Sequence, residues 1–159
     1  MNKTKTRKVL IVDDDPGVRT MNGFTLMHEG WDVFYESEGP SALARLYQED
    51  FDLVLLDLRL PYLSGDHLMK LLKDKDRIPA KVLIISGLPG EVVASTAERY
   101  GAAGFLKKPY TPQELLKKIS DTGGFQSPGR EANLTAATAI CPRQKFCDKK
   151  HVDKSRGSL

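Results

Sequence analysis

Cysteine is scarce in this chain of 159 residues, and the long stretch before residue 123 contains none. The only two cysteines, Cys141 and Cys147, lie near the end of the chain. Small secreted proteins that depend on disulfides carry far more, so the sequence excludes a disulfide scaffold and fits a reducing cytoplasm. These cysteines and His151 do not resemble a zinc site either, because such a site usually needs four ligands in a familiar spacing.

Long apolar runs are also missing, and none approaches the ~20 residues that a membrane-spanning helix needs. The first eight residues are basic, but the apolar run behind them, residues 9–12, is short and ends in three aspartates. A secretory signal requires a longer apolar segment at this place. We therefore expect a soluble, cytoplasmic protein that does not contact membranes.

The chain carries little net charge, only +3 at pH 7. Residues 1–122 hold 17 basic against 18 acidic side chains, whereas residues 123–159 hold 7 basic against 3 acidic ones. The positive surplus therefore belongs to the last segment of the chain. A surplus of this size is expected to be solvated rather than to bind nucleic acid.

Short apolar segments alternate with amphipathic ones between residues 8 and 121. The apolar segments predict five strands, at residues 8–12, 31–35, 52–57, 81–86 and 104–107, and the first of them is expected to be buried. An amphipathic segment with helical spacing follows each of them. Five strands alternating with five helices predict an α/β fold in which helices cover both faces of a parallel sheet.

The expected helices have recognisable ends. Asp15 and Pro16 provide an N-cap and a first-turn proline for a helix over residues 16–29, which Gly30 ends. Gly101 closes the fourth helix, and residues 111–114 form a capping box for the fifth. The inward faces of the last four helices are predicted from their spacing: Ala42, Leu43, Leu46 and Tyr47; Leu68, Leu71 and Leu72; Val93, Ala97 and Tyr100; Leu115, Leu116 and Ile119.

The two ends of the chain differ in character from this periodic part. Residues 1–6 are expected to be a flexible N-terminus before a single domain over residues 7–122. Residues 123–159 begin with glycine and proline and hold few large apolar side chains. This composition predicts a basic, disordered tail with at most a short helix near residues 131–140, and the domain should fold without it.

Polar residues with chemical potential follow four of the five predicted strands: Asp13 and Asp14, Asp57, Ser86 and Lys108. The carboxyl ends of parallel strands meet at one edge of a sheet, where open α/β sheets bind ligands. At ~4 Å and an effective dielectric constant near 20, each pair of carboxylates repels by about 4 kcal/mol. A cation is therefore expected among them, and hard oxygen ligands favour Mg²⁺. A metal beside a nucleophilic carboxylate suits phosphoryl transfer.

Each of these residues also has a simpler interpretation on its own. Three successive aspartates can be a helix N-cap with acidic neighbours, which we accept for Asp15. Asp57 can begin a loop, Ser86 can belong to a turn, and Lys108 can be a solvated charge. It is their common position at one edge of a sheet that favours a functional site.

The motifs together resemble the receiver domain of two-component response regulators of the chemotaxis-regulator type, over residues 8–121. They stand at residues 9–16 (VLIVDDDP), 52–61 (DLVLLDLRLP), 82–87 (VLIISG) and 104–110 (GFLKKPY). The resemblance implies a flavodoxin-like fold with strand order 2-1-3-4-5. It also implies a phosphoacceptor signalling domain rather than an enzyme with a substrate of its own.

Roles follow from the resemblance position by position. It implies that Asp57 accepts the phosphoryl group and, with Asp14, binds Mg²⁺ or Mn²⁺ directly. Asp13 assists through water, and the backbone carbonyl of Arg59 is a further ligand. Lys108 pairs with the phosphoryl group and precedes a cis proline. The implied switch residues are Ser86 and Phe105.

The same resemblance implies partners. A sensor histidine kinase or a histidine phosphotransfer protein donates the phosphoryl group. The face formed by the fourth helix, the fifth strand and the fifth helix then changes for a downstream protein, or for a second copy in a phosphorylation-dependent dimer. Because Phe105 lacks a hydroxyl group, it cannot make the hydrogen bond that a tyrosine there would make. Arg59 and Leu88 stand where the lifetime of the phosphoryl group is tuned.

Two other classes of protein remain to be distinguished. Phosphatases of the haloacid-dehalogenase type also use an aspartate nucleophile and Mg²⁺, in an Asp-x-Asp-x-Thr/Val motif. Asp13 and Asp15 have that spacing, but Gly17 takes the Thr/Val position, no cap domain fits, and Asp57 is left without a role. A binding module on the same fold leaves the acidic cluster without a purpose. Turnover of a simple phosphate ester separates the phosphatase from the receiver.

Overall fold

The structure is a computed structural model, and it describes residues 6–79 and 81–123. The predicted flexible N-terminus lies almost entirely outside these residues. So do the tail from residue 124 onward, the short helix near residues 131–140, and Cys141, Cys147 and His151. No helix of the described residues is long and apolar enough to cross a bilayer.

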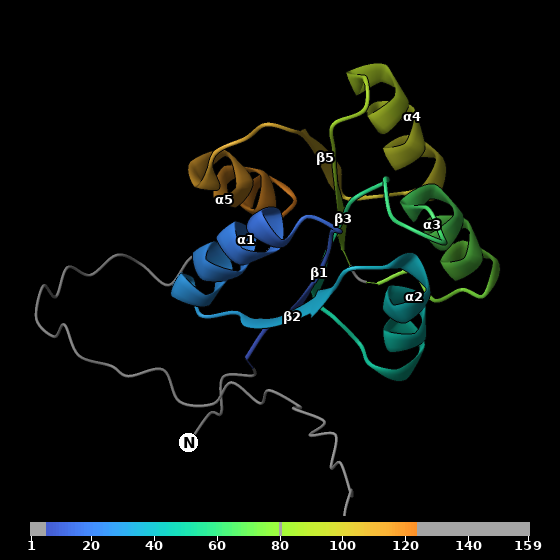
Figure 1. Cartoon of the computed structure of the whole chain (residues 1–159), viewed down its shortest axis with the longest axis horizontal. Helices are drawn as coiled ribbons and strands as arrows, with labels where there is room; N and C mark the ends of the chain where they lie inside the picture. Colours follow the sequence, from blue (N-terminus) through green and yellow to red (C-terminus); the bar gives the residue numbers. More distant parts are fainter. Residues whose placement is uncertain (1–5, 80, 124–159) are drawn as a thin grey trace, which may run out of the picture. The chain divides into compact units, whose positions relative to one another are not determined.

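Strands and helices alternate strictly along the chain, as the sequence predicts (Figure 1). The strands are β1 (Lys8–Val12), β2 (Asp32–Glu36), β3 (Leu53–Leu56), β4 (Val82–Ser86) and β5 (Gly104–Lys107). The helices are α1 (Pro16–His28), α2 (Gly39–Gln48), α3 (Gly65–Asp74), α4 (Gly90–Tyr100) and α5 (Pro112–Asp121). All five strands and all five helices predicted between residues 8 and 121 are therefore present, and the predicted boundaries differ from the observed ones by at most one or two residues.

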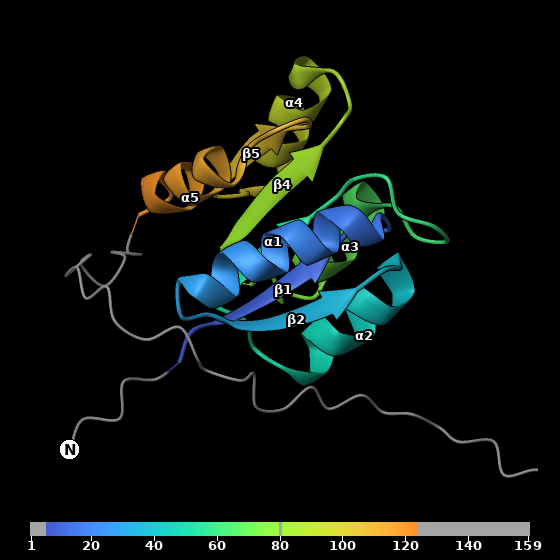
Figure 2. The same ribbon diagram turned by 60° about the vertical axis from the view of Figure 1, so that its left-hand side comes forward.

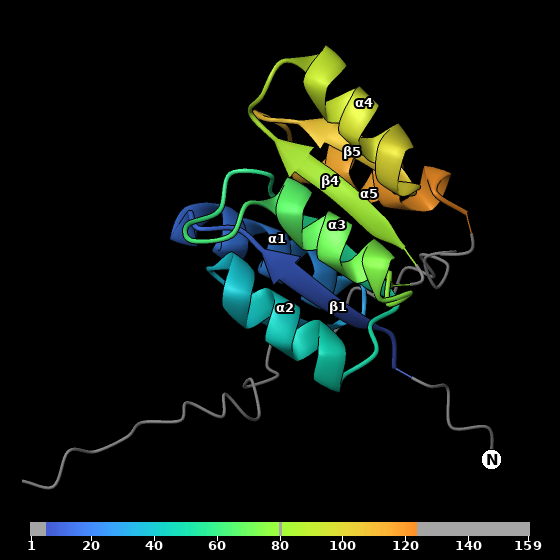
Figure 3. The ribbon, with the colours of Figure 1, turned by 90° about the vertical axis from the view of Figure 1, so that its right-hand side faces the viewer.

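The five strands form one parallel sheet in the order β2-β1-β3-β4-β5. Successive side chains point to opposite faces of a strand, so each strand feeds two cores. Helices α1 and α5 cover one face (Figure 2), and α2, α3 and α4 cover the other (Figure 3). This arrangement confirms the predicted α/β fold and its strand order.

The two cores divide the strand residues by alternation. On the side of α1 and α5, residues such as Val9, Ile11 and Leu55 pack with Leu26 and Leu115. The opposite core is larger. It holds the alternate strand residues, Leu10, Val12, Leu56 and Ile84, packed against residues of α2, α3 and α4: Leu46, Leu68, Met69, Leu72, Val93 and Ala97. Because β1, β3 and β4 are buried on both faces, their carboxyl ends are held in fixed positions.

Two of the predicted inward-facing residues are exposed instead. Tyr47 is 41% exposed and Leu71 is 38% exposed. Tyr47 follows the buried Leu46, and Leu71 precedes the buried Leu72. Neighbouring residues are rotated by about 100° around the helix axis. On these ten-residue helices the buried stripe is narrow, so the neighbouring apolar residue falls at its border.

The predicted helix ends are confirmed. The carboxylate of Asp15 accepts hydrogen bonds from the backbone of Gly17 and Val18 at the start of α1. Thr111 and Glu114 form both bonds of a capping box on α5. Gly101 ends α4 in the left-handed conformation, with φ of 67°, which glycine adopts without strain. Helix ends with defined hydrogen bonds or backbone conformations therefore fix where α1, α4 and α5 begin or end.

Candidate functional site

The predicted site residues meet at one edge of the sheet. Asp13 follows β1, Asp57 follows β3 and Lys108 follows β5, and in Figure 2 the strand arrows point toward this same edge. Their backbones continue the sheet: Asp57 N donates to Val12 O at 2.9 Å, and Lys108 N donates to Ser86 O at 3.0 Å. The positions of these side chains are therefore set by the sheet rather than by free loops.

The Lys108 ammonium group bridges two buried carboxylates. Its Nζ lies 2.7 Å from Oδ2 of Asp13 and 2.7 Å from Oδ2 of Asp57. Asp13 is 3% exposed and Asp57 is 5% exposed, so both acids depend on this partner for charge compensation. The sequence predicts that the three residues converge but not that the lysine joins the two acids.

Burial and pairing act against each other on these groups. Burial raises the pKa of the Asp13 carboxyl, and the hydrogen bonds from Lys108 and from the backbone of Asp15 offset this only in part. Burial alone lowers the pKa of the Lys108 ammonium, but hydrogen bonds and charges from Asp13 and Asp57 outweigh it and raise that pKa above its usual value. Lys108 is therefore charged at neutral pH.

The other oxygen of each buried acid is held by the backbone. Oδ1 of Asp13 accepts from Asp15 N at 2.9 Å, and Oδ1 of Asp57 accepts from Arg59 N at 3.0 Å. The guanidinium group of Arg19 also reaches this point, where Nη1 donates to the backbone oxygen of Asp13 at 2.6 Å. Both carboxylates are thus fixed in orientation before any ligand binds.

The acidic residues fit a hard divalent cation. Asp13, Asp14 and Asp57 each offer an oxygen, and these oxygens lie within 4.8 Å of one another. Asp14 is exposed while the other two are buried, so the group opens toward solvent on one side. Three carboxylates against one ammonium group leave a surplus of negative charge. All-oxygen ligands with an open side are what Mg²⁺ prefers.

The remaining predicted site residues lie around this centre. Ser86 is fully buried at the end of β4, and its Oγ accepts from Leu88 N at 3.3 Å. Arg59 approaches through its backbone, while its side chain is exposed. Phe105 is half-buried on β5, packs against the core under α4, and has the ammonium of Lys118 5.4 Å from its ring centre. The Lys108–Pro109 peptide bond is cis, as expected.

Asp15 does not belong to the acidic centre. Its carboxylate caps α1, with Oδ1 2.7 Å from Gly17 N and 3.2 Å from Val18 N. A phosphatase of the haloacid-dehalogenase type would need this residue as its second catalytic aspartate. The capping role of Asp15 and the pairing of Asp57 with Lys108 both argue against that class.

Gly65 shapes the site in a way that the sequence motifs do not predict. It opens α3, and its N donates to Leu58 O at 3.1 Å. A Cβ atom here would overlap the backbone oxygen of Asp57 and lie 2.9 Å from the Cα of Leu58. Because these are backbone atoms, they can yield only if the segment carrying Asp57 moves.

We expect Gly65→Ala to lower the free energy of unfolding by about 2 kcal/mol, within the usual range for overpacking a close contact. The displaced backbone should also slow the phosphoryl transfer to Asp57 that the sequence resemblance implies. Urea unfolding measures the first effect and intact-mass labelling the second. Gly90→Ala is the control, because a Cβ there meets no atom within 4 Å. Equal behaviour of the two variants would show that the close approach at Gly65 is unimportant.

The sequence motifs do not predict a role for three further residues near the site, Arg19, Asn22 and Tyr110. Asn22 is 1% exposed, and its amide exchanges hydrogen bonds of 2.8 and 3.0 Å with the Tyr110 hydroxyl. A signal for Asn22 does exist. It stands four residues before Leu26 on the inward face of an amphipathic helix, where a polar residue needs a partner.

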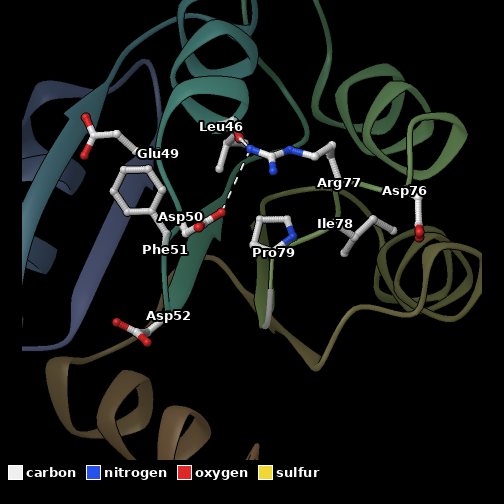
Figure 4. A pocket seen from close by; sticks show the side chains of 9 residues that line it. All are labelled: Leu46, Glu49, Asp50, Phe51, Asp52, Asp76, Arg77, Ile78 and Pro79. Atoms are coloured by element: carbon white, nitrogen blue, oxygen red, sulfur yellow. Dashed lines mark hydrogen bonds and ion pairs between the residues drawn. The ribbon is translucent and has the colours of Figure 1, made fainter. Parts of the chain in front are cut away.

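A separate cavity of about 280 Å³ lies at the opposite edge of the sheet (Figure 4). Phe51 and Asp52, which precede β3, and Pro79, which precedes β4, line it. Arg77 crosses it to donate to Leu46 O and Tyr47 O at 3.2 and 3.1 Å. The arginine thereby caps the end of α2. The charged side chain that crosses this cavity thus has a structural role at the end of α2.

In two curated proteins of similar sequence, the match covers about half of their own length. Sensory transduction protein RegX3 of Mycolicibacterium smegmatis is 34% identical over 111 residues, 70% of this chain and 48% of that protein. The uncharacterized transcriptional regulatory protein YcbL of Bacillus subtilis is 32% identical over 110 residues, 69% of this chain and 48% of that protein. The chain thus spans about half the length of the curated relatives it matches.

Solved structures of single domains match over nearly their whole length. The chemotaxis response regulator CheY4 of Vibrio cholerae has a TM-score of 0.69 and 28% identity, covering 74% of this chain and 99% of that one. The BeF3-activated DrrB receiver domain has a TM-score of 0.65 and 25% identity, covering 74% and 97%.

The response regulator receiver domain family matches residues 9–120. This range contains Asp13, Asp14, Asp57 and Lys108, the acidic pocket and its lysine. The matched part also carries the strand order found in the sheet. The chain therefore belongs to the response regulator receiver domain family, whose members are phosphoacceptor modules of two-component signalling and depend on a cognate histidine kinase.

Proposed function

We propose that Asp57 accepts a phosphoryl group from the phosphohistidine of a sensor histidine kinase or a histidine phosphotransfer protein. The observation that carries the proposal is the contact of Lys108 with both buried acids at 2.7 Å, beside a third carboxylate. This arrangement presents a buried nucleophile, a positive charge and a set of oxygen ligands within one pocket. The domain extends over residues 7–122 and acts in the cytoplasm.

In the transfer step, an oxygen of Asp57 forms a bond to phosphorus as the phosphorus–nitrogen bond of the donor breaks. The leaving imidazole keeps the electron pair of that bond and takes up a proton. Lys108 turns from Oδ2 of Asp57 to an oxygen of the phosphoryl group, which is a stronger acceptor with more negative charge. The Ser86 hydroxyl donates to another of these oxygens.

Asp14 and Asp57 are the direct ligands of Mg²⁺ or Mn²⁺ in this proposal. Asp13 acts through water and Arg59 through its backbone carbonyl. A cation held by these residues would supply positive charge to neutralise the phosphoryl oxygens. The chain's own part is to hold the ligands in place, which the backbone bonds to Oδ1 of Asp13 and Asp57 achieve.

The output face consists of α4, β5 and α5, with Ser86 and Phe105 as the switch residues. Support comes from the position of Phe105, half-buried between the core under α4 and Lys118 of α5. Ser86 and Phe105 lie on the neighbouring strands β4 and β5, and in this proposal a change at Ser86 reaches both helices through Phe105. A downstream protein, or a second copy in a phosphorylation-dependent dimer, would bind this face, and no nucleic acid is required.

The proposal is tested by incubating the chain with acetyl phosphate and Mg²⁺ and following its intact mass. One phosphoryl adduct is expected, and it should be lost in hydroxylamine, as acyl phosphates are. The DrrB receiver domain is described as BeF3-activated, so BeF3 should also bind here and block labelling. Absence of an adduct, or steady turnover of p-nitrophenyl phosphate, would contradict the receiver function in favour of an inert or an enzymatic one.

A further inference from the structure

Helix α1 contacts the site with two polar side chains, Arg19 and Asn22, which stand three residues apart on one face. Arg19 donates to the backbone oxygen of Asp13, on the β1 side of the pocket. Asn22 exchanges hydrogen bonds with Tyr110, on the β5 side. Since Asp13 is joined to Lys108 at 2.7 Å, these contacts close a ring around the pocket.

The Asn22–Tyr110 pair is built as a mutual contact. Asn22 is almost fully buried, and the hydroxyl of Tyr110 lies 2.8 Å from its Nδ2 and 3.0 Å from its Oδ1. Tyr110 itself packs against the apolar core between α1 and α5. Buried polar groups persist where they are hydrogen-bonded, and this pair joins residues 88 positions apart. The contact therefore ties the segment after β5 to α1.

Lys108 stands between two anchors. On one side its own backbone N donates to Ser86 O at 3.0 Å. On the other side Tyr110 follows only two residues later and is held by Asn22. The Tyr110 hydroxyl is close enough to the site for its pKa to respond. Burial raises that pKa most, the Asn22 bond and the Lys108 charge lower it, and the Asp13 and Asp57 charges raise it.

We infer that Asn22 and Tyr110 are positioning residues that hold Lys108 in reach of the phosphoryl group during transfer. This inference rests on the proposed function of Asp57 and Lys108. With the segment anchored at both ends, Lys108 explores few arrangements and meets its partner without first being ordered. Without the Tyr110 hydroxyl, ordering of the Lys108–Pro109 segment is added to the barrier of each transfer.

Tyr110→Phe removes this anchor by a single oxygen. We expect labelling by acetyl phosphate, at saturating Mg²⁺ and donor, to slow about tenfold, since ~1.4 kcal/mol of lost transition-state stabilisation is tenfold in rate. Affinity for Mg²⁺ should not weaken, because the carboxylates keep their backbone bonds and face a less firmly placed ammonium. General damage to the pocket would instead weaken Mg²⁺ binding together with the rate.

Two further variants keep the test decisive. Asn22→Leu combined with Tyr110→Phe replaces the polar pair by an apolar one, which should restore stability while the rate stays slow. Tyr35→Phe is the matched control. The Tyr35 hydroxyl also lies against α1, at Gly23, but belongs to the edge strand β2 and not to the Lys108 segment. Its loss should leave the labelling rate unchanged.

The possible results distinguish a failure of the positioning role of Tyr110 from a failure of the proposed phosphoryl transfer to Asp57. If wild type is labelled on Asp57 but Tyr110→Phe is labelled as fast, the positioning role is wrong. The same conclusion follows if Mg²⁺ affinity falls in proportion to the rate, or if the double variant recovers both stability and rate. If wild type is not labelled on Asp57 at all, it is the proposed function that fails.

Discussion

Asp57→Asn is expected to abolish phosphoryl labelling while the domain remains folded. The change keeps the size of the side chain, and its Oδ1 can still accept from Arg59 N, but the nucleophilic carboxylate is gone. The Lys108 ammonium loses one of its two carboxylate partners but keeps Asp13, so no charged group is left buried without a partner and the domain should still fold. Intact mass after incubation with acetyl phosphate and Mg²⁺ measures the loss.

Chelation should reproduce much of this loss in the wild-type chain. Without a divalent cation, a dianionic donor approaches three carboxylates that a single ammonium group compensates only in part. Each close like-charge pair costs about 4 kcal/mol at an effective dielectric constant near 20, so EDTA should slow labelling by orders of magnitude. Asp14→Asn should act in the same direction by weakening Mg²⁺ binding.

Asp74→Asn is the control for these variants, because Asp74 is an exposed residue at the end of α3. It should be labelled like wild type. An adduct that persists in Asp57→Asn, or that forms equally well in EDTA, would place the acceptor elsewhere. The hydroxylamine sensitivity of such an adduct would tell whether another carboxylate has taken its place.

Much of the fold can be predicted because local and global signals agree. Apolar strands, caps at Asp15 and Thr111, and the terminating Gly101 each specify a boundary with its own physical cause. The failures are equally physical. The second strand lies one residue later than expected. Tyr47 and Leu71 are partly exposed, because residue spacing alone does not define how wide a buried stripe a short helix presents.

The site divides in the same way. That Asp13, Asp57 and Lys108 converge follows from parallel strands ending at one edge, and the structure confirms it. Which atoms pair does not follow, because it depends on side-chain conformations and on burial. The close approach of Gly65 to Asp57 and the bond between Asn22 and Tyr110 join segments that no local pattern connects.

The contacts of Lys108 predict a large effect on stability as well as on chemistry. Lys108→Ala leaves the carboxylates of Asp13 and Asp57 buried together without their shared counter-charge. Breaking a buried ion pair by removing one partner typically costs 3–5 kcal/mol, and this lysine is itself partly exposed, so we expect the lower end, about 3 kcal/mol. In a domain of this size that corresponds to a fall in Tm of roughly 10 °C.

Mg²⁺ should reverse most of this loss, because the cation replaces the missing positive charge among the same oxygens. A ligand that binds only the folded state stabilises it by about 2.7 kcal/mol at a hundred times its Kd. Removing the ammonium also removes a competitor for the carboxylates, so Mg²⁺ should bind Lys108→Ala more tightly than wild type. Thermal unfolding with and without Mg²⁺ therefore should show a larger upward shift in the variant. Lys107→Ala, at the exposed neighbouring lysine, supplies the baseline. If Lys108→Ala loses no more stability than Lys107→Ala, or gains no more from Mg²⁺ than wild type, the lysine does not compensate the acidic pair.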